Sequence, residues 1–389
     1  MEELKKVVCA YVDEISDELI SVSRDIYEHP ELKFEEEYAS ALLADKVRLA
    51  GFSTELGVAR LKTAIQATHP TASDGPTVAI ISEYDALPVI GHACGHNLIA
   101  AAGLGAALAV GKVKENLPGR LVYFGTPGEE GGGGKVVMVE AGLFEGIDAA
   151  MMFHPWSNTV LDRRSLAISE VMIEFTGKAS HASGSPEKGI NALDAVIQTF
   201  NGINALRQHI KDGARIHGII TDGGAKPNIV PEHAAANFYV RALENEYRDE
   251  LLEKLRACAE GAALATGAKL DFKIVGHSNK AMKPNQAIGD AFVENLAELG
   301  EPLVPPPADS GMGSTDMGDV SQVVPSIHAY IKICEESVAA HSREFAQAAI
   351  SKRGLDVMLI AAKTMAMTTI DILTNPELAK KMWEEFRST

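Results

Sequence analysis

The sequence predicts an α/β protein in which a mostly parallel sheet carries helices on both faces and a ferredoxin-like domain of βαββαβ order is inserted. Apolar, β-branched runs alternate with helical stretches as far as Pro155. After Ser165 this alternation changes to a strand, a helix, two strands, a helix and a strand. The length of 389 residues also exceeds the size at which one hydrophobic core stops growing. We therefore expect one domain made of residues 1–164 and 279–389, and an inserted domain of residues 165–278.

Three apolar runs in the first domain are typical of strands that are buried on both faces. They are residues 77–82, 120–125 and 149–153. Helical spacing of apolar residues predicts the helices 2–28, 35–50, 97–110, 135–140 and 287–299. Asn97 is expected to cap the third of these helices. Strands that alternate with helices form a parallel sheet, and ligands bind beyond the carboxyl ends of its strands.

The remaining elements complete both domains. The inserted domain is expected to contain strand 165–177, helix 189–210, strands 215–221 and 233–243, helix 246–266 and strand 269–275. In the last part of the chain, residues 302–318 are rich in Pro, Gly and Ser and predict a loop, and residues 326–333 predict a strand. His341 is expected to begin a final helix that runs to about Thr374.

The composition excludes some classes of partner. The formal net charge is −17, and no basic patch is evident, so a nucleic-acid partner is not expected. No apolar run reaches the length that a membrane-spanning helix needs, so no membrane partner is expected. The first residues alternate charged and apolar side chains, unlike a targeting segment, and the four cysteines are sparse. We expect a cytoplasmic protein with reduced thiols.

A polar segment, EYDALPVIGHACGHN at residues 83–97, directly follows the first buried strand. Cys94 and His96 stand two apart on it, so a thiolate and an imidazole could face one ion, as zinc prefers. Alone, this spacing is also typical of a buried structural Cys and a hydrogen-bonded His.

Two adjacent carboxylates, Glu129 and Glu130, follow the second buried strand. They form either a solvated acidic turn or a metal ligand beside a proton-transfer group. The glycines after them lack the spacing of a phosphate-binding loop. His154 ends the third strand and His341 precedes the last helix. Five donors therefore converge from strand ends and loops: Cys94, His96, Glu130, His154 and His341.

Three residues of the inserted domain are further candidates. His181 lies in a turn rich in Gly and Ser, where an imidazole could reach another surface. Asn228 and Arg241 are either a turn former and a surface charge, or groups that bind a substrate, since Arg forms a bidentate pair with a carboxylate.

Six segments resemble, in chain order, the motifs of the two-metal aminoacylase and carboxypeptidase family. They are EYDALPVIGHACGHN, GTPGEEGGGG, MMFHPW, GKASHAS, PNIVPEHAAANFYVR and AAHSREF. Within this family they are most similar to the amidohydrolase branch, which includes indoleacetyl-amino-acid hydrolases, p-aminobenzoyl-glutamate hydrolases and related dipeptidases. The resemblance covers nearly the whole chain, including the inserted domain.

The resemblance implies a role for each candidate residue. The metal ligands would be Cys94, His96, Glu130, His154 and His341, with Cys94 bridging two ions. Glu129 would be the general base. His181 would stabilise the oxyanion from a lid domain, often that of a partner subunit. Asn228 and Arg241 would bind the substrate near its reacting carbonyl and its carboxylate.

Two residues depart from the family pattern. Many relatives have a ligating His where this chain has Glu83, and Asp85 is expected to orient the site by contacting a ligand. Many members of the branch have Asp after Cys-Gly-His, and Asn97 replaces it here, which removes one charge beside the ligands.

These roles predict a hydrolase that cleaves the amide bond of N-acyl amino acids or dipeptides by a metal-activated water, with two divalent ions (Zn, Mn or Co) per subunit. A p-aminobenzoyl-glutamate or aryl-acyl-amino-acid hydrolase is the alternative within enzymes. A protein that binds a small carboxylate without catalysis is the alternative outside them. We expect a homodimer that pairs through the strand 165–175 of the lid or dimerisation domain.

Overall fold

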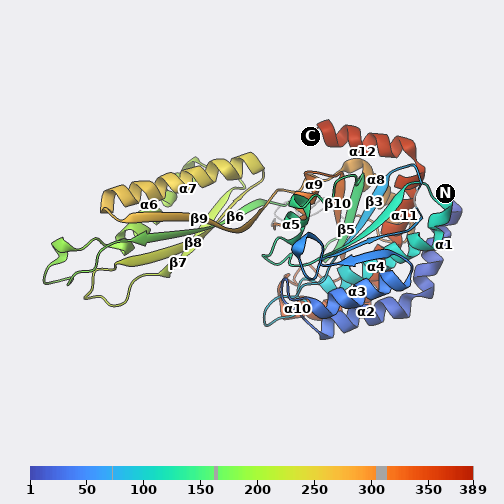
Figure 1. The fold of residues 1–389 in the computed structure, drawn as a ribbon, viewed down its shortest axis with the longest axis horizontal. Helices are drawn as coiled ribbons and strands as arrows, with labels where there is room; N and C mark the ends of the chain where they lie inside the picture. The colour runs from blue at the N-terminus through green and yellow to red at the C-terminus, as the bar shows by residue number, and fades with distance from the viewer. Residues whose placement is uncertain (72, 162–164, 304–312, 389) are drawn as a thin grey trace. The chain divides into compact units, whose positions relative to one another are not determined.

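The computed structural model describes residues 1–71, 73–161, 165–303 and 313–388 (Figure 1). The chain divides into two compact units. Unit 1 comprises Met1–Arg163, Met282–Met312 and Asp316–Thr389, and unit 2 comprises Arg164–Ala281 and Gly313–Thr315. The short piece Gly313–Thr315 belongs to unit 2, and the Leu166 N–H donates to the carbonyl oxygen of Gly313 at 2.8 Å.

Unit 1 contains a six-stranded sheet in the order β1-β2-β4-β3-β5-β10. Its strands are β1 Ser53–Leu56, β2 Ile65–Thr68, β3 Thr77–Glu83, β4 Arg120–Thr126, β5 Ala149–Trp156 and β10 Ser326–Lys332. The neighbours β4-β3, β3-β5 and β5-β10 are parallel, and β1-β2 and β2-β4 are antiparallel. The sheet is therefore mostly parallel, which confirms the predicted fold class.

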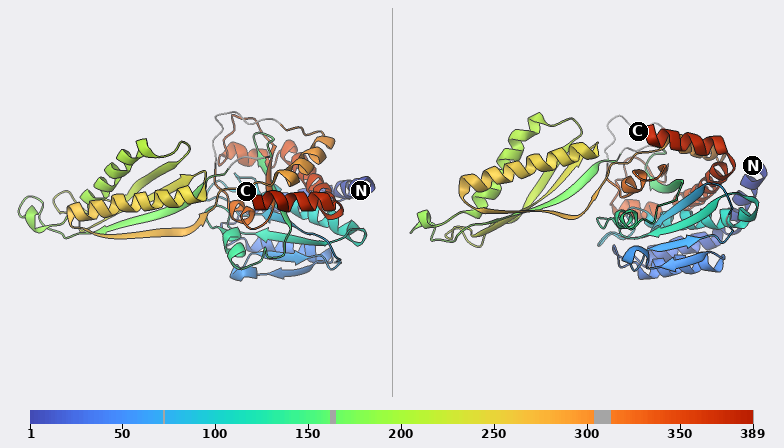
Figure 2. Two further views of the ribbon diagram at one scale, coloured as in Figure 1. Left: turned by 90° about the horizontal axis from the view of Figure 1, so that it is seen from above. Right: turned by 45° about the horizontal axis from the view of Figure 1, so that its top comes forward.

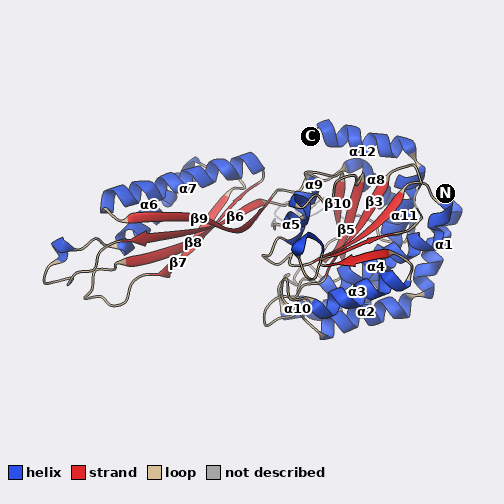
Figure 3. Ribbon diagram, viewed as in Figure 1, coloured by secondary structure: helices blue, strands red, loops and turns tan. Residues whose placement is uncertain are grey.

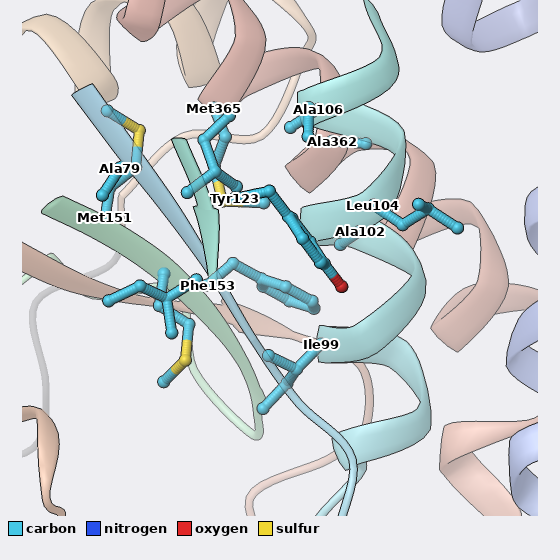
Figure 4. Close-up of a cluster of buried hydrophobic side chains, with 14 of the residues drawn as sticks. Ala79, Ile99, Ala102, Leu104, Ala106, Tyr123, Met151, Phe153, Ala362 and Met365 are labelled. Carbon is cyan, nitrogen blue, oxygen red and sulfur yellow. The ribbon is translucent and has the colours of Figure 1, made fainter. Parts of the chain in front are cut away.

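The helices of unit 1 pack on this sheet and on one another. They are α1 Glu2–Glu14, α2 Ser16–Glu28, α3 Glu37–Leu49, α4 His96–Val113, α5 Gly134–Glu140, α8 Gln286–Glu298, α9 Met317–Ser321, α10 Arg343–Ala349, α11 Lys352–Thr374 and α12 Pro376–Ser388. Figure 4 shows Tyr123 and Phe153 of the sheet beside Ala102 of α4, and all three side chains are fully buried. Helix α4 approaches β3 so closely at Gly103 that only glycine fits there. A Cβ at this position would lie 2.2 Å from Ser82 Oγ, which is too short for a contact between two atoms. This packing sets the first half of α4 against the end of β3.

Two helical stretches, His96–Asn116 and Lys352–Thr374, are long and apolar enough to cross a membrane. In the apolar 18-residue window of each stretch, 89% of the first window and 78% of the second are buried inside the structure. The core helix of a globular unit has the same length and composition.

Unit 2 contains a four-stranded antiparallel sheet in the order β7-β8-β6-β9. Its elements are β6 Ala167–Thr176, α6 Ala192–Leu206, β7 Arg215–Asp222, β8 His233–Ala242, α7 Asn245–Thr266 and β9 Lys269–Asn279. Helices α6 and α7 lie side by side on one face of the sheet in every view (Figure 2), and Figure 3 separates them by colour from the strands. Buried and partly exposed residues alternate along β6, since its other face lacks this helical cover. The βαββαβ order is as predicted.

The predicted edge strand is wrong. Strand β6 pairs with both β8 and β9, so it lies inside the sheet and has no open edge for a second copy. The edges belong to β7 and β9. Alternation in a sequence reports which face of a strand is buried, and it carries no information about the strand's place in the sheet.

Other local predictions are also wrong. Asn97 does not cap α4, because Gly95 is the N-cap and Asn97 lies within the helix, where its side chain donates to Ser23 Oγ at 2.9 Å. His341 has a φ of 60° and precedes α10, and Ser351 caps a separate helix α11, so the predicted final helix is broken. The short strands β1 and β2 were not predicted. The predicted loop 302–318 falls largely on residues 304–312, outside the described residues, and α9 begins at Met317.

Candidate metal centre

The predicted ligands of unit 1 converge because their strands are parallel and end at one edge of the sheet. Cys94 and His96 lie where the chain passes from β3 into α4, and His154 lies on β5. Glu130 follows β4. His341 precedes α10, and its N–H donates to the carbonyl oxygen of Ala93 at 3.0 Å, which ties it to the cysteine segment.

The structure brings these ligand atoms within reach of common ions. Two groups have all of their ligand atoms within 4.8 Å of one another: Cys94 with His96 and His154, and Cys94 with Glu130 and His341. Cys94 Sγ lies 3.5 Å from His154 Nε2, and His341 Nε2 lies 3.3 Å from Glu130 Oε1. Cys94 belongs to both groups. Sulfur, nitrogen and carboxylate donors of this kind suit zinc and related divalent metals.

His96 is oriented for metal binding by Asp85. Its Nδ1 lies 3.0 Å from Asp85 Oδ1 and 2.9 Å from the Asp85 carbonyl oxygen. A proton on Nδ1 leaves Nε2 as the metal-binding atom, and this buried nitrogen has no hydrogen-bond partner among the described residues. The other oxygen of Asp85 accepts from the Glu130 N–H at 2.8 Å. Although burial opposes ionisation, His96 keeps the pKa of Asp85 below its ordinary value. The donor set therefore fits a bound divalent metal.

Glu129 stands beside these ligands with an unengaged carboxylate. Its side chain makes no hydrogen bond or ion pair within the described part of the chain. Its carboxylate oxygen lies within 4.8 Å of ligand atoms of His96 and Glu130. Removal from water, together with the negative charges of Glu83 and Glu130, raises the pKa of Glu129 well above its ordinary value. A carboxylate with a raised pKa is suited to accept and return a proton.

Three residues near the centre are not among the candidates from the sequence: Lys135, Asp316 and Glu36. Lys135 forms buried ion pairs with Glu83 and with Asp316. Glu36 of the segment before α3 accepts from the Gly128 N–H at 2.9 Å, next to Glu129. The only signal in the sequence was their charge, because each contact joins segments that are far apart in the chain.

The three candidates of unit 2 fall at two places in that unit. The Ala182 N–H donates to the carbonyl oxygen of Asn228 at 3.0 Å, so the turns of His181 and Asn228 are neighbours. His181 is exposed, and its Nδ1 accepts from the Gly184 N–H at 3.1 Å, which leaves an N–H on Nε2 as a donor to solvent. Arg241 lies on β8 and donates to Ser314 Oγ at 3.1 Å.

Glu36→Gln is expected to change the pH dependence of stability. Burial raises the pKa of Glu36 from 4.5 to about 7, so between these values the folded chain binds more protons than the unfolded chain and stability falls as pH rises. Glutamine does not ionise, so the Glu36→Gln variant does not lose stability in this way as the pH rises. Its free energy of unfolding, relative to the parent, should therefore rise by about 2–3 kcal/mol between about pH 5 and pH 8, measured by urea unfolding.

The exposed neighbour Glu35 supplies the control for this measurement. Glu35→Gln should differ from the parent by the same amount at every pH. A constant difference for Glu36→Gln as well would contradict the assignment.

The fold and this centre define a metal-dependent hydrolase. The chain matches the model of Peptidase family M20/M25/M40 over residues 79–365 and belongs to that family, which confirms the resemblance of its motifs. A Xaa-Arg dipeptidase of Mus musculus is 37% identical over 401 residues, covering 100% of this chain and 93% of that protein. One of the subunits of p-aminobenzoyl-glutamate hydrolase from Escherichia coli is 28% identical over 460 residues, covering 99% and 95%. A solved dinuclear metal-binding peptidase of the M20 family from Bacillus subtilis shares the fold, with a TM-score of 0.71, 22% identity, and coverage of 92% of this chain and 99% of that one.

Proposed function

We propose that this enzyme hydrolyses the amide bond of dipeptides and N-acyl amino acids, and that dipeptides with a C-terminal arginine are its first candidate substrates. The observation that carries the reaction is the free carboxylate of Glu129 beside the converging ligands. The similarity to a Xaa-Arg dipeptidase along the whole chain supports the choice of substrate. The four cysteines are all free, which suits the cytoplasm as its location.

Cys94, His96, Glu130, His154 and His341 would hold two divalent ions of zinc, manganese or cobalt. Cys94 would be available to both ions, since it belongs to both ligand groups. When bound, such ions polarise the amide carbonyl and lower the pKa of the attacking water.

The side chains of this chain perform the proton transfers and bind the substrate. Glu129 takes the proton of the attacking water and returns it to the nitrogen of the leaving amine. The Nε2–H of His181 donates to the oxygen that becomes negative in the transition state. Asn228 and Arg241 bind the substrate near its carbonyl and its free carboxylate.

A substrate panel tests this function. Metal-reconstituted protein is incubated with dipeptides that end in Arg, Lys, Leu or Glu, with N-acetyl amino acids and with p-aminobenzoyl-glutamate, and the released amine is measured. The highest kcat/KM is expected for dipeptides that end in Arg. The highest value for p-aminobenzoyl-glutamate would favour the second candidate, which the similarity to the E. coli hydrolase supports. No release from any of these compounds would contradict the proposed function.

A homodimer through unit 2 belongs to the same proposal. Strand β7 pairs only with β8 among the described strands, so its other edge offers free backbone groups. Ile219 on this strand is 67% exposed and Ile220 is 44% exposed. An open edge that carries large apolar side chains is a typical surface for pairing with a second copy.

Ile219→Lys is expected to convert the dimer to a monomer, because it sets two like charges against each other across the symmetric contact. The molar mass is measured by light scattering after size-exclusion chromatography. Ile274→Lys on the opposite edge strand β9, where Ile274 is 50% exposed, is the matched control and should remain dimeric. A monomeric parent, or a dimeric Ile219→Lys protein, would contradict the proposed contact.

A further inference from the structure

A fully buried lysine lies next to the metal centre, and no step of the proposed reaction uses it. Lys135 is in the first turn of α5, and its side chain has no exposure to solvent. Its Nζ forms ion pairs with Glu83 Oε1 and, at 2.8 Å, with Asp316 Oδ1. Asp316 also accepts from the Lys135 N–H at 3.0 Å. The ammonium group therefore joins the end of β3, the start of α5 and the start of α9.

The carboxylates around Lys135 form a set that could hold a metal ion. Glu83, Glu129 and Asp316 offer three carboxylate oxygens within 4.8 Å of one another. Oxygen-only sets of this kind suit hard divalent cations. Glu83 Oε2 is buried without a hydrogen-bond partner among the described residues and lies 3.6 Å from His96 Nε2. This acidic cluster, defined as Glu83, Glu129 and Asp316, thus adjoins a metal ligand and includes the general base.

The charges in this cluster require a cation. Burying carboxylates together is costly unless a positive charge offsets their repulsion and replaces their hydration. Burial alone would lower the pKa of Lys135, but Asp316 and Glu83 raise it above its ordinary value, so the side chain remains an ammonium ion. The Lys135 ammonium is covalently attached to the chain and cannot dissociate, whereas a metal ion can. It forms ion pairs with Glu83 and Asp316 and leaves the carboxylate of Glu129 without a partner among the described residues.

We infer that the Lys135 ammonium is a fixed cation that occupies the acidic cluster in place of a further metal ion, and so keeps the Glu129 carboxylate free to transfer protons. Lys135 is on this view a positioning residue, since it acts through Glu83 and Asp316 and touches neither substrate nor ligated metal. The inference rests on the proposed function of Glu129. The occupancy of the cluster can be measured without any substrate.

Lys135→Gln tests the inference, because glutamine keeps an N–H donor for the carboxylates and removes the charge. After equilibration with excess Zn²⁺ or Mn²⁺ and removal of free metal, the parent and the variant are compared by elemental analysis. The variant is expected to bind one more ion per chain than the parent. Its kcat should fall by at least about tenfold as the metal concentration is raised, with KM nearly unchanged, because the added ion engages Glu129.

Lys114→Gln is the matched control. Lys114 is also buried, but it donates to the carbonyl oxygens of Leu117 and Gly119 and contacts no carboxylate among the described residues. Its loss should leave the number of bound ions unchanged. In the double variant of Lys135→Gln with Asp316→Asn the additional ion should be lost, because one of its three oxygen ligands is replaced by an amide.

The outcomes separate this inference from the proposed function. An additional ion in Lys135→Gln supports the fixed cation even if no tested substrate is cleaved. A variant that binds no additional ion overturns the inference, whatever its activity. If Lys135→Gln fails to fold, Lys135→Met and Lys135→Arg are compared: the uncharged variant should admit the ion and the charged one exclude it, and equal metal contents would overturn the inference.

Discussion

Glu129→Gln is expected to lower kcat by about 10²–10⁴-fold, the range that a positioned general base contributes. Glutamine has almost the same shape as glutamate but cannot accept a proton at neutral pH. Because Glu129 is not among the five proposed ligands and its side chain makes no hydrogen bond within the described residues, the fold and the metal content should be retained. The measurement is kcat with the best substrate of the panel, together with elemental analysis of the bound metal.

The matched control for this prediction is Glu140→Gln, which changes an exposed carboxylate of helix α5. It should leave kcat and KM unchanged. The catalytic assignment would be wrong if Glu129→Gln retained a third or more of the parent kcat. A loss of bound metal together with activity would instead make Glu129 a ligand.

The features predicted well from the sequence are those that depend on neighbouring residues and on one rule of topology. Apolar runs located the central strands, and parallel strands place their carboxyl ends together. This rule was enough to expect that Cys94, Glu130 and His154 would meet, and their ligand atoms fall into overlapping groups in the structure. Alternation and helical spacing gave the order of unit 2 for the same local reasons.

The features that were missed depend on contacts between distant segments. Lys135 stands after four glycines and meets Asp316 only through tertiary packing, and no periodicity in the chain marks that pair. Strands β1 and β2 have four residues each, too few to show alternation. The start of α10 after His341, and not at it, depends on the left-handed conformation of His341, which residues other than Gly rarely adopt. In each case the surrounding structure determines the local conformation.

Cys94→Ala is expected to abolish activity and to lose bound metal from both sites, because Cys94 is the one residue that the two ligand groups share. Burial raises the pKa of the Cys94 thiol above its ordinary value, so without an ion this side chain is a neutral group in the core. The parent should lose thermal stability when a chelator removes its metal. A ligand at a hundred times its Kd contributes about 2.7 kcal/mol, which corresponds to a fall in Tm of about 3 °C for a chain of 389 residues. The variant has little metal to lose, so its Tm should respond little to the chelator.

Cys334→Ala removes a thiol from the same unit outside the metal centre, where Cys334 Sγ lies 4.0 Å from the Trp156 carbonyl oxygen. It should bind as much metal as the parent and respond equally to the chelator. Comparing the two alanine variants separates the loss of a ligand from the loss of a sulfur alone, since both changes remove the same atoms, although Cys334 is only partly buried. If Cys94→Ala kept one ion per chain, the thiolate would serve a single site, and the two ions would have to be bridged by another group.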